Sequence, residues 1–321
     1  MSKKITNGHA LIIGVGADLS CTIKDAEGLA EILKDEARCA YPPEQVHLLT
    51  EEKANRESVL ITLDKLAKST NDESTIIIYF SGHGHQVITT AGESYYLMTH
   101  GYDVNCLYKT AISGAEFSEK LKAISAKKVL VLLDCCHAGG MAGIKGVEIT
   151  KSPIPSEALK LLTEGSGYAL IASSQGDEVS FTGKPYSVFT AALIEALCGH
   201  GKNIAIKDGY VRVGDLAMHT SNRVSQLTED KQHPILHYKQ GDNFVIAFYA
   251  AGETQAKKLP FQVETETVYE LKNHEQPVDT QVNINNMQGG FVQPDWKVEG
   301  GVTQVAGNLI MESDKSNKEK K

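Results

Sequence analysis

A histidine and a cysteine, both able to take part in nucleophilic chemistry, each follow a hydrophobic stretch of the chain. His83 lies in the run Tyr79–Gly84 (YFSGHG), and Cys136 lies in the run Leu132–Gly140 (LLDCCHAGG). The residues that lead into each run are apolar and rich in β-branched side chains, which is typical of buried parallel strands. We therefore expect His83 and Cys136 just past the carboxyl ends of two strands of one sheet, where open α/β folds place reactive groups.

Cysteine and histidine together can act as a nucleophile and its base. A thiol with its usual pKa of about 8.5 is mostly protonated at neutral pH, so a reactive cysteine needs a neighbour that increases its thiolate fraction. His83 can do this and can then protonate a leaving amine, which makes peptide-bond hydrolysis the simplest reaction. Four glycines allow a substrate backbone to approach and leave N–H groups for an oxyanion: Gly82, Gly84, Gly139 and Gly140.

A zinc site is the alternative interpretation of the same region. Five residues of ligand type occur there: His83, His85, Cys135, Cys136 and His137. No Cys-x-x-Cys or His-x-x-x-His spacing accompanies them, so the thiolate interpretation is favoured. Zinc chemistry would predict bound metal in stoichiometric amount.

The alternation of expected strands and helices indicates the fold that must position these residues. Strands are expected over residues 9–15, 46–50, 75–80, 95–98, 127–133, 168–173, 233–238 and 244–247, and helices over 23–37, 55–68, 115–124, 187–197 and 213–227. This order predicts an α/β fold with about six strands in a mostly parallel sheet flanked by helices. Residues 139–167 are expected to form a long surface loop with at most one short helix.

Composition and charge argue against several classes of function. Of the 321 residues, 41% are hydrophobic and 22% are charged, which is typical of a soluble globular protein. The net charge of −8 does not favour nucleic acid as a partner. The N-terminus lacks the apolar core of a signal peptide, and no run approaches the roughly 18 apolar residues of a membrane span. We therefore expect a cytoplasmic protein with no membrane partner, whose six cysteines are thiols.

The two runs resemble the motifs of caspase-like cysteine peptidases. Phe80–Gly84 is similar to their histidine motif, and Asp134–Gly139 (DCCHAG) resembles the Asp-Ser-Cys-His-Ser-Gly motif of metacaspases and their bacterial relatives, the orthocaspases. The histidine also precedes the cysteine by about fifty residues, as it does in caspases. The resemblance implies a caspase-haemoglobinase-like fold in which Cys136 is the nucleophile, His83 is the base, and the backbone amides of Gly84 and Cys136 form the oxyanion hole.

One residue of the second motif departs from the family pattern. Cys135 stands where the family has serine, which places two thiols side by side in the sequence. A bystander role is preferred for Cys135, and its purpose is left open.

The resemblance extends over about residues 9–248. Gly14–Leu29 resembles the opening strand, loop and helix start of the family, while Ala172–Glu178 and Ser187–Thr190 resemble its small-subunit strand and following helix. The implied peptidase domain is 1–250, with a large-subunit-like part (1–140), a linker (141–166) and a small-subunit-like part (167–250). Residues 251–321, rich in Gln, Asn, Val, Thr and Gly, are expected to be a β-rich or partly disordered interaction tail with an unknown protein partner.

The resemblance also implies a class of substrate. Caspases that cut after aspartate use arginines in the first pocket, whereas metacaspases use acidic residues there and cut after arginine or lysine. The positions that match the metacaspase pocket are Asp25 and Asp134. A buried carboxylate pair is costly unless a cationic side chain joins it, so we expect protein or peptide substrates with a basic P1 residue. Asp177 is a weaker third candidate, for which a solvated loop charge is the preferred interpretation.

No cofactor is expected. Many metacaspases bind calcium through an acidic cluster, and the matching stretch here, Thr110–Phe117, offers only Glu116. Calcium prefers six to eight oxygen ligands and usually several carboxylates, so no dedicated calcium site is expected.

Two further points of function stay open at this stage. Family members are often zymogens that cut themselves between the two subunits, and the linker region contains Lys145, Lys151 and Lys160, which are equally consistent with solvated lysines. The alternative to a peptidase is a catalytically silent caspase-like scaffold that is recruited through its C-terminal tail. The presence of both His83 and Cys136 argues against that alternative.

Overall fold

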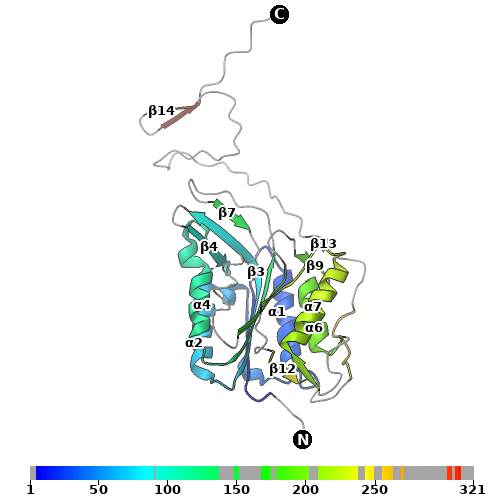
Figure 1. The fold of residues 1–321 in the computed structure, drawn as a ribbon. Helices are drawn as coiled ribbons and strands as arrows, with labels where there is room; N and C mark the ends of the chain where they lie inside the picture. The colour runs from blue at the N-terminus through cyan, green and yellow to red at the C-terminus, as the bar shows by residue number, and fades with distance from the viewer. Residues whose placement is uncertain are drawn as a thin grey trace, which may run out of the picture.

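A central sheet separates two layers of helices in the computed structural model of the protein (Figure 1). The structure describes residues 5–89, 92–136, 148–151, 168–174, 178, 180–201, 209–237, 243–248, 255–262, 269–270, 302–305 and 308–311.

Six strands form the continuous path of this sheet. Their order is β11 (Ile235–His237), β8 (Tyr168–Ala172), β6 (Lys128–Cys136), β3 (Thr75–Thr89), β1 (Gly8–Gly14) and β2 (Val46–Thr50). All neighbours are parallel except β11, which runs antiparallel to β8. The predicted α/β fold with a mostly parallel sheet is confirmed.

The central strands are hydrophobic at nearly every position because both of their faces are covered. In β3, Ile76, Ile78 and Phe80 pack into one core, while Ile77 and Tyr79 pack into the other. Successive side chains of a strand point to opposite faces, so a strand buried on both sides needs an unbroken apolar run.

Helices α1 (Cys21–Lys34), α6 (Val188–Leu197) and α7 (Val213–Leu227) cover one face of the sheet, and α2 (Arg56–Ser69) and α4 (Gly114–Lys122) cover the other (Figure 1). All five lie close to the bounds expected from the sequence. Side chains at three of their starts, those of Asn55, Ser113 and Ser187, accept a hydrogen bond from a backbone N–H in the first turn of the helix.

Strand β3 is longer than expected and takes part in a second, antiparallel set of pairings. Beyond Phe80 it continues to Thr89 and pairs with β4 (Gly92–Leu97) and β7 (Glu148–Lys151), and β4 also pairs with β5 (Ile112–Ser113). The expectation that residues 139–167 contain no strand is therefore wrong, because the second half of β3 offers an edge on which β7 adds a ladder.

The remaining described elements are short. They are the 3-10 helices η1 (Pro43–Gln45), η2 (Glu51–Ala54) and η3 (Val104–Cys106), helix α3 (Leu107–Thr110), and the paired strands β10 (Tyr210–Arg212) with β12 (Val245–Phe248), β9 (Phe181–Thr182) with β13 (Tyr269–Glu270), and β14 (Val302–Val305) with β15 (Asn308–Met311). Strand β12, expected as the last strand of the fold, thus pairs with β10 in a separate ladder.

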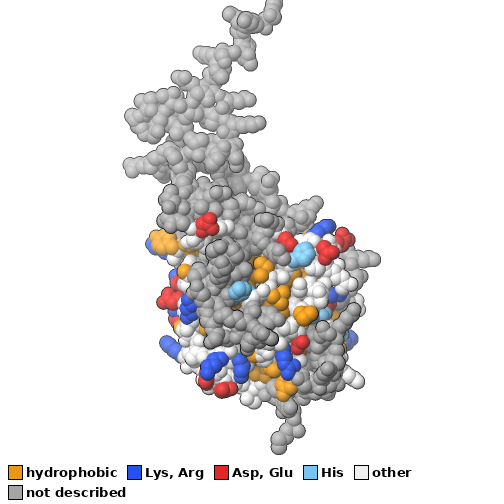
Figure 2. Space-filling view, in the orientation of Figure 1, with side chains coloured by type: hydrophobic (Ala, Val, Ile, Leu, Met, Phe, Trp, Pro, Cys, Tyr) orange, Lys and Arg blue, Asp and Glu red, His pale blue; other side chains and the backbone are white. Residues whose placement is uncertain are grey.

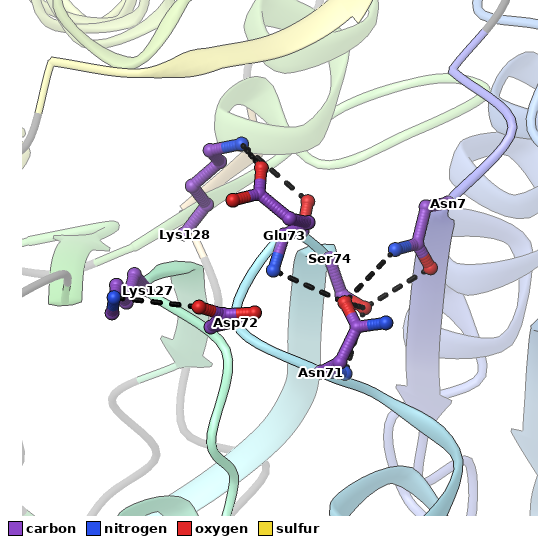
Figure 3. Close-up of polar contacts among 7 residues, drawn as sticks. All are labelled: Asn7, Asn71, Asp72, Glu73, Ser74, Lys127 and Lys128. Atoms are coloured by element: carbon purple, nitrogen blue, oxygen red, sulfur yellow. Dashed lines mark hydrogen bonds and ion pairs between the residues drawn. The ribbon is translucent and has the colours of Figure 1, made fainter.

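A polar network joins the amino ends of the three central strands (Figure 3). We call Asn7, Asn71 and Ser74 the amino-edge cluster. The Ser74 hydroxyl donates to Asn7 Oδ1 at 3.0 Å, and Asn71 Oδ1 accepts from Asn7 Nδ2 at 3.2 Å. Lys127, the residue before β6, lies 3.5 Å from Asp72. These contacts tie β1, β3 and β6 together at the edge opposite the predicted site.

The described surface carries charges of both signs. Figure 2 shows acidic and basic side chains interspersed over the face in view rather than gathered by sign. Within the described residues, no helix combines the length and apolar composition that crossing a bilayer requires.

Candidate active site

The sheet places His83 beside Cys136. The two residues are register partners on the adjacent parallel strands β3 and β6, which lie about 4.8 Å apart in such a ladder. His83 is only 3% exposed. The sequence predicted that both residues would follow their strands. Instead they lie within the strands, because β3 continues past His83 and β6 extends as far as Cys136. The side chain of Cys136 is outside the described part of the structure.

A carboxylate that the sequence analysis missed holds the imidazole of His83. Asp18 Oδ2 lies 2.8 Å from His83 Nε2. The other ring nitrogen, Nδ1, is buried and has no hydrogen-bond partner among the residues that the structure describes. His83 therefore has one nitrogen engaged by a negative charge and one available to a reacting group.

A tight turn after β1 presents Asp18. Gly16 and Ala17 have φ values of 71° and 58°, in the left-handed region, and the N–H of Gly16 donates to Thr22 Oγ1 at 2.8 Å. The N–H of Val15 donates to the carbonyl of Ser81 at 3.0 Å, which joins this turn to β3. A lone aspartate in a loop has no sequence pattern, so only the fold reveals its contact with His83.

Two glycines next to His83 lie in close packing. A Cβ atom at position 84 would lie 1.7 Å from the Tyr95 hydroxyl oxygen, and one at position 82 would lie 2.7 Å from Val15 Cγ2. A side chain at either position would therefore displace Tyr95 or Val15. The oxyanion role expected for the Gly84 amide stays a prediction.

Asp25 and Asp134, which we call the acid pair, are brought together by a serine. Asp25 Oδ1 accepts the backbone N–H of Ser187 at 2.7 Å, and Asp134 Oδ2 accepts its hydroxyl at 2.6 Å. Thr190 Oγ1 lies 3.3 Å from the same Asp134 oxygen. Ser187 also caps α6, because its Oγ accepts the N–H of Thr190 at 3.0 Å. The sequence analysis noted Ser187 as part of a motif but did not find this role.

The acid pair is buried, and one oxygen of each carboxyl group has no hydrogen-bond partner among the described residues. Both residues are only 1% exposed. Burial, followed by the negative charge of Asp134, raises the pKa of Asp25 well above its usual value, and burial likewise raises the pKa of Asp134. Asp25 Oδ2 and Asp134 Oδ1 accept no hydrogen bond from the described residues. A cationic group that reached these two oxygens would remove much of the cost of burying them.

The acid pair has a neighbour on the wall of a cavity. Burial and the charges of Asp25 and Asp134 raise the pKa of the Cys21 thiol to about 12, so Cys21 is protonated at neutral pH. Cys21 lines a cavity of about 480 Å³ at the start of α1. The other residues that line it are Ser20, Lys24, Gly183, Lys184, Pro185, Pro260, Phe261 and Gln262.

The fold explains the second cysteine of the motif. Cys135 is 4% exposed and packs in the core beneath α2 and α4, whereas Asp134 faces α6. Burial raises the pKa of the Cys135 thiol to about 12. Because the side-chain period of a strand is two, the position that shares a face with Asp134 is 136 and not 135. Cys135 is thus a small core residue with an unreactive thiol.

The structure brings together fewer of the other candidate residues. Among the described residues, no three His, Cys, Asp or Glu side chains are grouped so that they could hold a metal ion. Glu116, the one carboxylate of the stretch compared with a calcium site, forms an ion pair with Arg56 at 2.5 Å. Lys151 lies in β7, while Asp177, Lys145 and Lys160 fall outside the described residues.

The chain matches a known peptidase domain over most of its length. A peptidase family model described as the caspase domain matches residues 7–245, a span that includes His83, Cys136 and the acid pair. No curated protein matches the chain. The solved structures that resemble it include protein GSU0716 from Geobacter sulfurreducens, which is 17% identical, with a TM-score of 0.49 over 74% of this chain and 96% of that one.

Proposed function

Because the chain belongs to the caspase-domain family of peptidases, we propose that it is a cysteine endopeptidase that hydrolyses peptide bonds after arginine or lysine. The observation that carries the specificity is the acid pair: two buried carboxylates share Ser187, and each retains an oxygen without a partner among the described residues.

The proposed mechanism uses the neighbouring positions of His83 and Cys136. His83 takes the proton of the Cys136 thiol, and the thiolate attacks the carbonyl carbon of the scissile bond. The backbone amides of Gly84 and Cys136 stabilise the oxyanion, and His83 protonates the leaving amine. Water then attacks the acyl-enzyme, with His83 as the base, and releases the thiol. Asp18 keeps the imidazole oriented throughout these steps.

The proposed specificity follows from charge and geometry. A guanidinium or ammonium group at P1 would place a positive charge next to two carboxylates in a site of low dielectric constant, where charge-assisted hydrogen bonds are strong. An aspartate at P1 would add a third negative charge to the same site and would be rejected.

The test is hydrolysis of fluorogenic peptides that differ only in arginine, lysine or aspartate at P1, with and without a chelator. We expect the arginine and lysine peptides to be cleaved with or without chelator, the Cys136→Ala variant to be inactive, and the Cys135→Ala variant to remain active. The Cys135 variant is the matched control, since it removes a thiol from the adjacent position of the same strand.

Three results would contradict the proposal in different ways. Cleavage after aspartate alone would overturn the role of the acid pair. Loss of activity with chelator would show a metal requirement, and zinc bound in stoichiometric amount would then support zinc chemistry. If no peptide is hydrolysed under any condition, the scaffold alternative is supported. A denaturing gel of the wild-type and Cys136→Ala proteins shows in the same experiment whether the linker lysines are cut, because self-processing predicts fragments only in the wild type.

A further inference from the structure

Strand β9 (Phe181–Thr182) begins beside the carboxyl end of β8, at the edge of the sheet that contains the candidate site. The residue before it, Ser180, forms hydrogen bonds with the hydroxyls of Ser173 at 3.0 Å and Ser174 at 3.3 Å, directly after β8. The N–H of Ser173 in turn donates to Leu133 of β6 at 2.9 Å. The chain that follows β9 reaches Ser187, which forms a hydrogen bond with Asp134 of the acid pair. An extended chain lying along β9 is therefore next to the end of β6, where Cys136 is found.

One side of β9 faces the protein and the other faces outward. The N–H of Phe181 donates inward to Gln232 Oε1 at 2.9 Å. Successive residues of a strand direct their N–H and C=O groups to opposite sides, so those of Thr182 lie on the outer side. An outer edge of this kind is a site to which an extended peptide can add as a further strand.

This outer edge is occupied by the C-terminal segment of the chain itself. Strand β13 pairs antiparallel with β9, with Tyr269 opposite Thr182 and Glu270 opposite Phe181 (Figure 1). The pairing joins two segments that are far apart in the sequence. It involves backbone groups, as does the recognition of an extended peptide substrate.

The segment of the chain that precedes β13 contacts the helical layer of the peptidase domain at several points. The N–H of Lys257 donates to the carbonyl of Cys198 at the end of α6, at 2.9 Å, and Arg38 donates to the carbonyl of Lys258 at 2.6 Å. The ring of Phe261 then packs edge to face against Tyr186, with the centroids 5.2 Å apart. Residues 257–261 are thus fixed to the peptidase domain and lead towards the site.

The residue after this fixed segment shares a cavity with the end of β9. Gln262 lines the same cavity as Gly183, the residue that follows β9. Only a short stretch separates Gln262 from Tyr269, so β13 is held near its partner strand at an effective concentration that can reach the millimolar range. A free peptide must compete with this internal segment.

We propose that the segment at Tyr269–Glu270 is an internal competitor that occupies the substrate-binding edge of the enzyme, an inference that rests on the proposed peptidase function. The sequence gives this segment a further property of a substrate, because Lys272 follows Glu270 by two positions and is a basic residue of the type proposed for P1. A substrate binds when β13 leaves β9, so the tail lowers the fraction of molecules that are competent to bind.

The kinetic test uses full-length protein with a proline in β13. Proline cannot donate a hydrogen bond to a ladder, so Tyr269→Pro should release the edge of β9. If the tail occupies the edge about nine-tenths of the time, KM for an arginine peptide falls about tenfold while kcat stays the same. Val282→Pro, further along the tail, is the matched control and should leave KM unchanged. Equal KM values for wild type and Tyr269→Pro would overturn the proposal.

A binding test separates failure of this proposal from failure of the peptidase function. The probe is a fluorescein-labelled peptide of residues 264–273 (ETETVYELKN), and fluorescence anisotropy measures its binding to Cys136→Ala protein. We expect the Cys136→Ala protein that also carries Tyr269→Pro to bind about tenfold more tightly than the one with the native tail. Equal binding to both, or binding to neither, would overturn the proposal even if no variant hydrolyses any peptide.

Discussion

The carboxylate of Asp18 engages only one of the two nitrogens of His83. A hydrogen bond to Nε2 fixes the orientation of the ring and favours one tautomer, so that Nδ1 can exchange a proton with the nucleophile. Asp18 does not touch the substrate in the proposed mechanism. It is therefore a positioning residue, and its loss should affect the rate more than the binding.

Replacement of Asp18 by asparagine should lower kcat with little change in KM. The expected loss is about tenfold to a hundredfold, part of the roughly 10²–10⁴-fold that general acid–base catalysis contributes. Peptide hydrolysis by Asp18→Asn, Asp18→Glu and Asp72→Asn measures it. Partial rescue by glutamate is expected, and the Asp72 control, at the opposite edge of the sheet, should behave as wild type. A rise in KM at constant kcat would show that Asp18 acts on binding instead.

The acid pair should reduce stability at neutral pH. Because the folded protein raises the pKa of Asp25, the favourable contribution of its protonated form is fully present below the usual aspartate pKa of about 3.9 and is lost as the pH rises through the higher folded value. Asp25→Asn keeps an acceptor for the Ser187 N–H without the charge. We expect this variant to be more stable than wild type by about 1 kcal/mol at pH 8, and cleavage after arginine to be weakened.

Urea unfolding at pH 4 and pH 8 tests this prediction. The advantage of Asp25→Asn should be larger at pH 8, whereas Asp64→Asn, which loses an ion pair with Lys120 at the surface, should show no such gain. If Asp25→Asn is no more stable than wild type at pH 8, then the carboxylate of Asp25 is neutralised in the folded protein by another route.

Sequence reasoning found the residues of the site that carry a motif and missed those that depend on the fold. His83 and Cys136 were predicted to lie near each other because both follow buried strands, and the register confirms that they are neighbours. Asp18 and the bridging role of Ser187 are contacts between segments that are distant in the sequence. No local pattern encodes such contacts, since one aspartate or serine in a loop looks like any other.

At the scale of elements, the amino-edge cluster helps to set the register that defines the site. Ser74 is fully buried, and its hydroxyl joins Asn7 to Asn71 at the start of β1 and β3. Register is strongly specified wherever the faces of a strand are buried, and the cluster adds a polar constraint at one end. Its effect is on stability and not on chemistry, because it lies at the opposite edge from His83.

Ser74→Ala should therefore destabilise the protein without changing its specificity. Removal of the buried hydroxyl takes away the acceptor of the Asn71 N–H and a hydrogen bond to Asn7, which costs about 1–3 kcal/mol in the free energy of unfolding. Urea unfolding measures the loss, and the ratio of arginine to lysine cleavage should stay constant. Ser125→Ala, at an exposed serine, is the control and should change stability by less than about 0.5 kcal/mol. A changed cleavage ratio in Ser74→Ala would show that the cluster also affects the site.

Helices and parallel strands were predictable from the sequence, whereas the added strands were not. Apolar periodicity identified α7 with the bounds that the structure gives, and β2 likewise. Strands β7 and β9 are short and gain their structure from the partner to which they add. Pairings of this kind depend on long-range contacts, and the two segments carry too little hydrophobic pattern to predict them.

At the scale of the whole molecule, the sheet separates two large hydrophobic cores, which differ in their relation to the candidate site. The core beneath α2 and α4 packs hydrophobic side chains next to the site, with Cys135 among its members. The core beneath α1, α6 and α7 reaches the acid pair, and residues 257–261 lie along this same side. The proposed substrate pocket and its proposed competitor thus share one face of the sheet.

The register of β6 decides which of the two neighbouring cysteines lies opposite His83. A shift of β6 by one residue would bring Cys135 to the level of Cys136 and turn its thiol towards the acid-pair face, but it would also expel Asp134 from that face and reverse every hydrophobic side chain of the strand. The thiol of Cys135 therefore cannot replace that of Cys136 unless the centre of the sheet unfolds. For this reason a single substitution at Cys136 is expected to abolish thiol chemistry at the site, even though another cysteine is the next residue in the chain.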